Sequence, residues 1–443
     1  MHVVLRGHKA VLSDSISLSP CLATQGRRRG CAGGLFLVKL APAVNISNLL
    51  FNKSSPAHRD QPKMSQEQHE ETSLPSTMRA LVLENVGQPL ILKTVPTPTP
   101  IPGTVIIKVI CALVDQNLPR ILSGEAGFTY PLPLTPGGRA IGRIAGTGID
   151  TTTFEVGQLV MLEPMIHARD DPDLCILLGA ADGWTSRGAK FMRDNWTMAG
   201  FAEYVRAPLE NTWALDENRF CGSPTDGGMG LEVYDLLQLP TQLTVYGGLR
   251  GINLQPGERV IVSPATGGFS GAAVAVASAM GANVIAASRN LEIMKQLQAT
   301  FPRVSIVQLK GDEEEDTRAM KQFGPVDAYI DLSSPVPNGS THARSAFKAL
   351  KFKGRASLMG ALFTDIPVSG GIALLNNLTI QGQYMYAKED VAAFIKLAES
   401  GLLKLGKEGG VDIVGKFGLD EIEKAFETAQ ASHGAGKLCM LVP

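Results

Sequence analysis

A candidate dinucleotide-binding stretch lies at residues 258–290. Its sequence is ERVIVSPATGGFSGAAVAVASAMGANVIAASRN. A short β-branched run is followed by a glycine-rich turn and then by a segment that is apolar on every face, which predicts a strand, a tight turn and a buried helix. Backbone N–H groups and the dipole at a helix N-terminus favour a pyrophosphate there. The turn residues of this candidate site are Thr266, Gly267, Gly268 and Phe269.

The glycine motif typical of dinucleotide-binding sites is only partly present in this turn. A G-x-G-x-x-G pattern laid over the turn puts Ala265 and Ser270 at its first and last positions, and keeps only Gly267, the glycine that lets the backbone approach a pyrophosphate. Taken alone, the motif also fits an ordinary turn between two apolar elements.

The residues after the second strand indicate which dinucleotide would bind. An NAD site usually has a carboxylate there, which binds the ribose 2′-hydroxyl. This chain has Ser288, Arg289 and Asn290 at these positions, and the nearest acidic residue is Glu292. A cation and two hydrogen-bonding side chains suit a 2′-phosphate, so we predict NADP(H); the alternative is that Arg289 is a solvated surface residue. Gly360, in GRASLMGAL, completes the candidate cofactor-binding residues.

The elements that would position this site repeat one α/β pattern. We expect strands at residues 259–263 and 283–287 with a helix at 272–280 between them. Four further buried strands are VSIVQL, VDAYIDL, GRASLMGAL and LTIQGQ, separated by amphipathic helices such as 290–301 and 341–351. Six strands of this kind predict a doubly wound parallel sheet.

Short, glycine-punctuated strands dominate the chain before this sheet. We therefore expect a β-rich domain at residues 78–235 and a dinucleotide-binding domain at 236–384. Residues 385–443 add helices at 389–400 and 420–431 and the strand KLCMLV. These elements exceed what a complete six-stranded doubly wound sheet needs. We predict that this segment returns to complete the β-rich domain.

Composition limits the class of protein. The chain has 443 residues, of which 44% are hydrophobic and 19% charged, and its net charge is −1, which is typical of soluble proteins with two or three domains and implies no basic nucleic-acid face. The six cysteines form no C-x-x-C pair, so neither a disulfide framework nor a zinc cluster is indicated. We expect a reducing compartment, no membrane span and no nucleic-acid partner.

The first 77 residues differ from the rest. Residues 1–63 carry nine Lys and Arg against two Asp, and no helix or strand period is sustained. We expect a disordered or targeting extension. A mitochondrial transit peptide fits it, and so does non-coding sequence read through to an upstream start, with Met64 or Met78 as the true start. The expected location is cytoplasmic, or mitochondrial if the extension is a transit peptide.

From Met78 to Pro443 the order of domains resembles the medium-chain dehydrogenase/reductase superfamily, which includes zinc alcohol dehydrogenases and zinc-free quinone and enoyl reductases. The motifs that carry the resemblance are PGTVIIKVICALV, YPLPLTPGGRAIGRIAGTG, GFAEYV, LTVYGGL, LQPGERVIVSPATGGFSGAAV and GLDEIEKAFE…GKLCMLV. The resemblance implies an α/β protein in which a GroES-like β-rich catalytic domain accompanies a Rossmann sheet, and an NADP-dependent oxidoreductase.

The resemblance allows the zinc ligands to be compared one by one. Zinc members carry a Cys in G-V-C-H and a later G-H-E, whereas the matching stretches here read L-V-D-Q and G-G-R. Asp115 stands at the Cys position, Gly138 at the His position and Arg139 at the Glu position. We therefore predict no metal site.

Other candidate zinc ligands are sparse. Between Glu163 and Gly200 only Cys175 occurs, so the four-cysteine structural zinc loop of the family is missing. After the extension the histidines are His167, His342 and His433, which we interpret as surface or capping residues rather than ligands.

Hydride transfer without a Lewis acid suits acceptors that are electron-poor by conjugation, such as a quinone, an enone or an enoyl thioester. The resemblance implies two catalytic candidates. Tyr246, in LTVYGGL, matches a Tyr that related reductases place near the nicotinamide, and Asp115 stands where a zinc ligand would face it. The alternatives are that Tyr246 only packs between domains and that Asp115 caps a helix beginning DQNLPRIL.

The residues and the resemblance are compatible with two functions. One is an NADPH-dependent oxidoreductase of the quinone or enoyl type acting on a small molecule, a group that includes polyketide-tailoring enzymes. The other is a non-catalytic, crystallin-like NADPH-binding protein, and alcohol or ketone dehydrogenation is less favoured. The insertion at residues 163–195 is expected to shape the substrate pocket or a contact in a homodimer.

Overall fold

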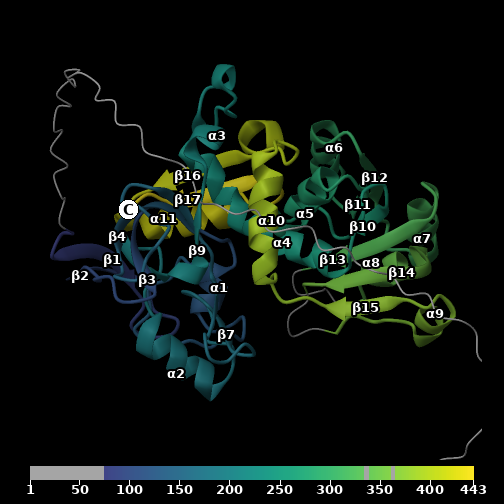
Figure 1. The fold of residues 1–443 in the computed structure, drawn as a ribbon. Helices are drawn as coiled ribbons and strands as arrows, with labels where there is room; N and C mark the ends of the chain where they lie inside the picture. The colour runs from purple at the N-terminus through teal and green to yellow at the C-terminus, as the bar shows by residue number, and fades with distance from the viewer. Residues whose placement is uncertain (1–73, 334–338, 361–364) are drawn as a thin grey trace, which may run out of the picture. The chain divides into compact units, whose positions relative to one another are not determined.

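Buried β-branched strands alternate with helices to build one six-stranded parallel sheet (Figure 1). The structure is a computed structural model that describes residues 74–333, 339–360 and 365–443. Its strands are β10 (Arg259–Val262), β11 (Asn283–Ser288), β12 (Val304–Gln308), β13 (Val326–Asp331), β14 (Leu350–Leu358) and β15 (Thr379–Gly382). Their order is β12-β11-β10-β13-β14-β15, and all neighbours are parallel. The predicted doubly wound sheet is confirmed, and its order reverses between β10 and β13, where such folds bind ligands.

Helices cover both faces of this sheet. Val260 and Val262 pack in the hydrophobic cluster that includes α4 and α5, whereas Ile261 packs in the cluster that includes α8. Successive strand residues point to opposite faces, so a sheet buried on both sides needs continuous apolar runs rather than alternation. The helices are α4 (Leu239–Gly251), α5 (Gly268–Ala279), α6 (Leu291–Thr300), α7 (Glu313–Lys321), α8 (His342–Ala349), α9 (Gly370–Leu375) and α10 (Lys388–Glu399).

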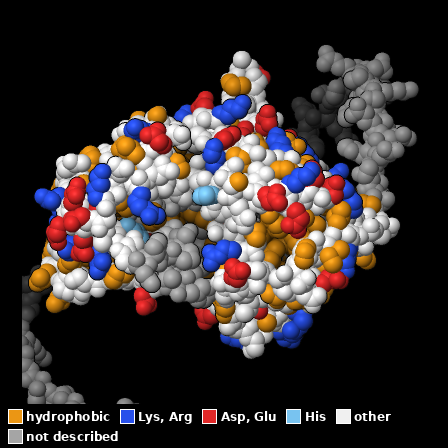
Figure 2. Space-filling view, turned by 180° about the vertical axis from the view of Figure 1, so that it is seen from behind, with side chains coloured by type: hydrophobic (Ala, Val, Ile, Leu, Met, Phe, Trp, Pro, Cys, Tyr) orange, Lys and Arg blue, Asp and Glu red, His pale blue; other side chains and the backbone are white. Residues whose placement is uncertain are grey.

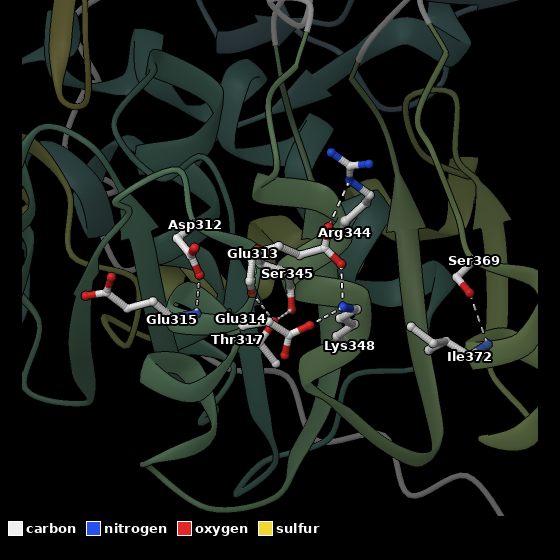
Figure 3. A network of polar contacts seen from close by, with 10 residues as sticks. All are labelled: Asp312, Glu313, Glu314, Glu315, Thr317, Arg344, Ser345, Lys348, Ser369 and Ile372. Carbon is white, nitrogen blue, oxygen red and sulfur yellow. Dashed lines mark hydrogen bonds and ion pairs between the residues drawn. The ribbon is translucent and has the colours of Figure 1, made fainter.

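Charged side chains join α7 to α8, as Figure 3 shows. The Glu313 carboxylate lies 3.3 Å from Arg344 Nε and 2.6 Å from Lys348 Nζ. The Asp312 side chain accepts a hydrogen bond from the Glu315 N–H at 2.8 Å and so caps α7. Because these side chains are partly exposed, each ion pair contributes about 1 kcal/mol or less. The contacts fasten two helices together, and none of these residues lines the cleft described below.

Short strands from before the parallel sheet and two from the end of the chain form a seven-stranded sheet around β3. Its order is β16-β17-β3-β4-β5-β9, with β8 also paired to β3, while β1 and β2 make a separate pair. The strands are β1 (Thr77–Val82), β2 (Ile91–Pro96), β3 (Thr104–Leu113), β4 (Ala140–Thr147), β5 (Leu159–Leu162), β8 (Tyr204–Pro208), β9 (Thr212–Ala214), β16 (Asp412–Phe417) and β17 (Lys437–Leu441). The predicted β-rich part, separate from the parallel sheet, is therefore present.

The end of the chain returns to this sheet in part. β17 pairs with β3, and α11 (Ile422–Ala431) packs on β16 and β17, as expected. α10 instead packs on α4, where Phe394 lies against Tyr246 with ring centroids 5.5 Å apart. The buried residues of α10 belong to a hydrophobic cluster that holds side chains from both sheets, so the predicted return of this helix to the β-rich domain stays a prediction. The domain boundaries at residues 235 and 384 stay predictions.

The remaining short elements connect or extend the β-rich sheet. They are α1 (Leu118–Leu122), β6 (Met165–His167), β7 (Cys175–Leu177), α2 (Ser186–Asn195) and α3 (Glu217–Cys221), with 3-10 turns η1 (Leu209–Asn211), η2 (Pro224–Asp226), η3 (Val233–Gln238), η4 (Gly406–Gly409) and η5 (Leu419–Glu421). The insertion predicted at residues 163–195 folds as the β6-β7 pair followed by α2.

Contacts divide the chain into residues 1–70 and one unit from Glu71 to Pro443, which contains both sheets. Of the expected disordered or targeting extension at residues 1–77, residues 1–73 lie outside the described residues, and β1 already begins at Thr77. In the part of the chain that the structure describes, no helix is long and apolar enough to span a membrane. Lys and Arg side chains are interspersed with Asp and Glu over the face seen in Figure 2.

Candidate dinucleotide and substrate cleft

The N-terminus of α5 follows the carboxyl end of β10, next to the point where the strand order reverses. Side chains cap α6 and α7, but no side chain caps α5, whose preceding residue is Gly267. A Cβ added at Gly267 would meet nothing nearer than Ser270 Oγ at 3.5 Å. No side chain therefore occupies the start of α5 at the turn of Thr266, Gly267, Gly268 and Phe269, and the predicted binding of a pyrophosphate there stays a prediction.

The three residues predicted to select the cofactor occupy different environments. Ser288 is buried at the end of β11, and its hydroxyl lies 2.9 Å from that of Thr266. Asn290 Oδ1 accepts a hydrogen bond from Ile293 N–H at 3.2 Å, so this side chain caps α6. Arg289 is exposed, and its guanidinium has no hydrogen-bond or ion-pair partner among the described residues. The structure thus leaves one of the three side chains free to meet a phosphate.

Gly360 lies where β14 ends beside the end of β13. A Cβ at Gly360 would come within 2.4 Å of the backbone N and O of Ser333, so only glycine allows this approach. The N–H groups of Met359 and Gly360 donate to the Asp331 carbonyl at 2.9 and 3.1 Å. The two strand ends are in this way fixed side by side at the floor of the cleft.

A buried polar network that the sequence did not reveal lies under this floor. The fully buried Asp331 carboxylate accepts hydrogen bonds from the Tyr329 hydroxyl at 2.5 Å and the Ser333 hydroxyl at 2.6 Å, and lies 3.3 Å from His342 Nε2. Burial acts to raise the pKa of Asp331, but hydrogen bonds from His342, Ser333 and Tyr329 leave it lowered. A carboxylate one strand away from the cofactor turn thus stays ionised, and it fixes Ser333 at the cleft.

His342 corrects our interpretation of the histidines. It begins α8 but is only 7% exposed, and its second ring nitrogen lies 2.6 Å from Ser340 Oγ. It is therefore a buried hydrogen-bonded residue rather than a surface one. His167 and His433 are exposed as expected, and His433 Nδ1 lies 2.7 Å from the Gln430 carbonyl oxygen.

A cleft of about 420 Å³ opens beside the turn and the strand ends. The parallel-sheet side contributes Thr244, Phe269, Leu332, Ser333, Met359 and Gly360. The β-rich side contributes Leu113, Asp115, Asn117, Leu118, Gly137, Gly138, Arg139, Pro164 and Leu177–Ala180. Asp115 and the cofactor candidates Phe269 and Gly360 are thus brought to one cleft. From the insertion at 163–195, Pro164 and Leu177–Ala180 line this cleft, and whether the insertion shapes a substrate pocket or a dimer contact stays a prediction.

Arg139, which the sequence analysis noted only because it replaces the Glu of the zinc motif, lines the cleft. Arg139 Nη1 lies 3.2 Å from Asp115 Oδ2, and the two side chains are 18% and 23% exposed. The guanidinium carbon lies 5.0 Å from the ring centroid of Phe269, which is a cation–π geometry. Asp115 Oδ1 also accepts from the Asn117 N–H at 2.8 Å. Asp115 therefore orders the turn before α1 and pairs with Arg139, but it does not cap that helix, because the N-cap residue is Asn117 and no side chain caps α1.

Gly138 is closed to a larger side chain. A Cβ there would lie 2.1 Å from the Leu178 carbonyl oxygen, a backbone atom that cannot easily move. A histidine at this position, which zinc relatives would require, does not fit without rebuilding the insertion. In the described residues no group of three His, Cys, Asp or Glu side chains is placed to hold a metal ion.

Tyr246 lies in α4 and is only 6% exposed. It is not among the cleft-lining residues of the described chain, and its ring packs against Phe394. The glycines after it explain the LTVYGGL motif: a Cβ at Gly247 would meet Met385 O at 2.5 Å, and one at Gly248 would meet Met359 Sδ at 2.1 Å. The packing alternative accounts for this motif, and the geometry does not support Tyr246 as a proton donor.

Aromatic side chains gather at one end of the cleft. Phe128 and Tyr384 line it, and Trp184 lies between them, with centroid separations of 5.4 Å to Phe128 and 6.4 Å to Tyr384. Trp184 comes from the insertion and Tyr384 from the connection between β15 and α10. The two sides of the cleft thus join in an aromatic cluster.

A buried carboxyl group stands behind Pro164. Glu163 is 4% exposed, and its Oε1 accepts a hydrogen bond from Asn211 Nδ2 at 2.7 Å. The Tyr386 hydroxyl and the Trp213 indole face the same carboxyl group without a hydrogen bond of good geometry. Burial raises the pKa of Glu163 to about 7. No sequence pattern singled out this residue, since a lone Glu after a strand normally lies at the surface.

Comparison with known families agrees with this architecture. Residues 101–217 match the alcohol dehydrogenase GroES-like domain, and residues 268–400 match the zinc-binding dehydrogenase family. The chain belongs to the medium-chain dehydrogenase/reductase superfamily, as an alcohol dehydrogenase-like member with a GroES-like domain and a Rossmann sheet. It is therefore an oxidoreductase of this type, for which a nicotinamide cofactor and a small-molecule substrate are expected.

Individual relatives are distant. An alcohol dehydrogenase of Rhizobium meliloti is 25% identical over 73% of this chain and 89% of its own length. An acryloyl-coenzyme A reductase of Metallosphaera sedula is 27% identical over 82% of this chain and 99% of its own. The structure of acetophenone reductase from Geotrichum candidum in complex with NAD covers 84% of this chain and 98% of its own, with a TM-score of 0.62 and 19% identity, which shows a shared fold.

Proposed function

We propose that the protein is an NADPH-dependent reductase of an uncharged, conjugated carbonyl compound, acting without zinc. The observation that carries this proposal is the Arg139–Asp115 pair, set in an otherwise mainly apolar cleft opposite the N-terminus of α5. A cation stands there where zinc relatives hold a metal.

The preference for NADPH rests on the end of β11. Positions 288–290 carry no acid, and Glu292 lies in α6 with its carboxylate 3.2 Å from Lys295 Nζ. A 2′-phosphate placed near Arg289 would meet a free cation and no repelling carboxylate. An NAD site would lack the carboxylate that binds its ribose.

Independence from zinc rests on the donor set, although the family matched over residues 268–400 is described as zinc-binding. Asp115 is the one oxygen donor at the three matched ligand positions, and it is engaged by Arg139 and Asn117. Position 138 cannot hold a side chain because of the Leu178 carbonyl. A single engaged carboxylate does not make a tetrahedral zinc site.

The class of substrate follows from the wall of the cleft. Its charged residues in the described chain are Asp115, Arg139, Arg120 and Glu125, of which the last two lie 4.0 Å apart. Two opposite pairs give no surplus of positive charge for the phosphates of a coenzyme A thioester. The aromatic cluster of Phe128, Trp184 and Tyr384 favours a substrate that carries a ring or an extended conjugated chain.

The bound cofactor would supply a hydride from its nicotinamide ring, which the residues at the ends of β13 and β14 would orient. The α5 N-terminus would bind the pyrophosphate, while Arg289 would bind the 2′-phosphate. The apolar walls from Leu113, Leu177 and Met359 would exclude water and so strengthen each polar contact to the acceptor. The polyketide setting and the cytoplasmic or mitochondrial location stay predictions.

The proposal is tested by following NADPH oxidation with a panel of acceptors. We expect turnover of aromatic enones and quinones, weaker turnover of enoyl-coenzyme A esters, and none of simple alcohols with NADP⁺. Tight NADPH binding without turnover of any acceptor would favour the non-catalytic alternative, and turnover of saturated ketones or alcohols alone would contradict the assignment to conjugated carbonyls.

A further inference from the structure

We propose that Arg139 is the catalytic residue that donates a hydrogen bond to the acceptor carbonyl, in the position where zinc relatives use a metal. This inference rests on the proposed function, which it extends by naming the group that holds the developing negative charge.

The placement of Arg139 supports direct contact with a bound acceptor. It lines the cleft together with Phe269 from the cofactor turn and Met359 and Gly360 from the strand ends, so its guanidinium faces the region where the nicotinamide would lie. Its side chain is 18% exposed, which leaves the cation partly desolvated but reachable. A cation in such a site acts more strongly on a carbonyl than it would in water.

Part of the hydrogen-bonding capacity of Arg139 is unused. A guanidinium has five N–H donors, and here one Nη1 contact goes to Asp115 at 3.2 Å. Its Nε is buried and has no partner among the described residues. Because Nε is shielded from solvent, an acceptor in the cleft would be met by the Nη groups of the partly exposed guanidinium rather than by Nε.

Two neighbours fix the direction of the guanidinium. Asp115 holds one edge, and the ring of Phe269 lies 5.0 Å from the guanidinium carbon on its face. Asp115 is in turn held by the Asn117 N–H. Asp115 is therefore a positioning residue, and a donor held in this way needs little reorganisation as charge develops.

A bound reduced nicotinamide would supply a hydride from one of its C–H bonds, and this hydride would form a C–H bond at the β-carbon of the enone. The π electrons of the C=C bond would shift to give an enolate whose oxygen is hydrogen-bonded to Arg139. Water would then protonate the α-carbon, leaving hydroxide, and the C=O bond would reform. The enone would gain the two electrons that the nicotinamide gives up, so atoms and charge balance without a metal.

The test compares Arg139→Met, Arg139→Lys and Asp115→Asn with wild type by two readouts. The first is kcat for an enone that the wild type reduces. We expect Arg139→Met to lower kcat at least about a hundredfold, Arg139→Lys to retain part of it, and added guanidinium ion to restore part of the Arg139→Met activity. Asp115→Asn should lower kcat less than Arg139→Met.

The second readout does not need turnover. 4-Nitrophenol carries an oxyanion on an aromatic ring, so in the presence of NADP⁺ the wild type should bind its coloured phenolate and lower the apparent pKa of the bound phenol. Arg139→Met should weaken phenolate binding about tenfold or more, because a charge-assisted hydrogen bond is lost. The matched control is Arg143→Met, which removes the Arg143–Glu217 pair of the same sheet outside the cleft and should leave both readouts unchanged.

The outcomes separate this inference from the proposed function. Enone turnover in wild type that survives in Arg139→Met, without loss of phenolate binding, would overturn the role of Arg139 and leave the function standing. Absence of enone turnover in wild type would overturn the function, and the phenolate measurement would then decide by itself whether Arg139 binds an oxyanion in the cleft.

Discussion

Arg139 and Arg289 are both arginines of the proposed cofactor and substrate region, but they are solvated differently. Arg139 is half-enclosed, paired with Asp115 and stacked on Phe269, so its charge acts in an environment of low dielectric. Arg289 is exposed on the connection after β11, and under the proposed function its partner would be the 2′-phosphate of the cofactor. The first is therefore suited to polarising a bond and the second to selecting a cofactor.

Replacing Arg289 by Ala should raise the KM for NADPH about tenfold or more and leave NADH kinetics nearly unchanged. The reason is the loss of charge-assisted hydrogen bonds to the 2′-phosphate, which NADH lacks. Steady-state kinetics with both cofactors measure the ratio. Arg318→Ala, an exposed change on α7, is the control. An NADPH/NADH preference that is the same in Arg289→Ala and wild type would show that Arg289 is only a surface residue.

Glu163 should make stability depend on pH. Its pKa of about 7 in the folded protein lies above the ordinary 4.5, so between these values the folded chain keeps a proton that the unfolded chain has released. The free energy of unfolding should therefore fall as pH rises from about 4.5 to about 7, by up to about 3 kcal/mol. Glu163→Gln should flatten this slope, as measured by thermal unfolding across that range.

The control for Glu163 is the exposed Glu155, whose change to Gln should leave the slope as in wild type. A wild-type protein whose thermal midpoint rises from pH 5 to pH 8, with no difference in Glu163→Gln, would contradict the assignment of a raised pKa to this carboxyl group.

At the scale of elements, the first turn of α5 packs against the segment before β17 and also borders the proposed phosphate site. Gly271 faces the segment before β17, where an added Cβ would lie 2.3 Å from Ala435 Cβ. The Ala435 N–H donates to the Thr266 carbonyl at 3.0 Å, so this segment is fastened to the cofactor turn. Gly267, by contrast, has room for a Cβ, whose nearest neighbour would be Ser270 Oγ at 3.5 Å. The two glycines of one helix start therefore have separate reasons to be small.

Gly271→Ala should destabilise the protein by about 1–3 kcal/mol, because a methyl group is forced into packed atoms. Gly267→Ala should leave the thermal midpoint near that of wild type but raise the dissociation constant of NADPH, because the methyl group stands in the path of the pyrophosphate. Thermal unfolding and cofactor titration of both variants separate these effects. A Gly267→Ala variant that binds NADPH normally would exclude this turn as the phosphate site.

Much of the element order could be predicted because β-branched runs such as Val260–Val262 bury both faces and so leave a strong local signal. What was missed depends on contacts between distant residues. Nothing near Tyr246 shows that Phe394 covers it, and nothing near Asp331 shows that His342 folds back onto it. Arg139 was visible in the G-G-R motif, but its pairing with Asp115 needed the register of the sheet. Gly360 and Phe269 were predicted as cofactor-binding residues because strand ends and helix starts carry the site in this fold; both line the cleft, and their roles stay predictions.

At the scale of the whole molecule, the cleft is lined by residues from two different sheets, which are formed by different parts of the chain. The parallel sheet supplies the cofactor turn through Phe269 and the floor through Gly360, while the β-rich sheet supplies Asp115 and Arg139 across from them. The insertion closes the same wall with Leu178, whose carbonyl oxygen blocks position 138. The proposed independence from zinc thus rests on how the insertion packs as well as on the residues at the ligand positions.

Purified protein should accordingly contain no stoichiometric zinc, and chelators should leave its activity unchanged, since Asp115 is engaged by Arg139 and position 138 has no room for a ligand. Elemental analysis and assays after dialysis against a chelator measure this. Restoring the family ligands with Asp115→Cys and Gly138→His together should lower stability without adding zinc, because the new side chain collides with the Leu178 backbone. One zinc per chain that resists dialysis in wild type would reverse this account, because the cation at the centre of the cleft would then be the metal and Arg139 would serve only to pack against it.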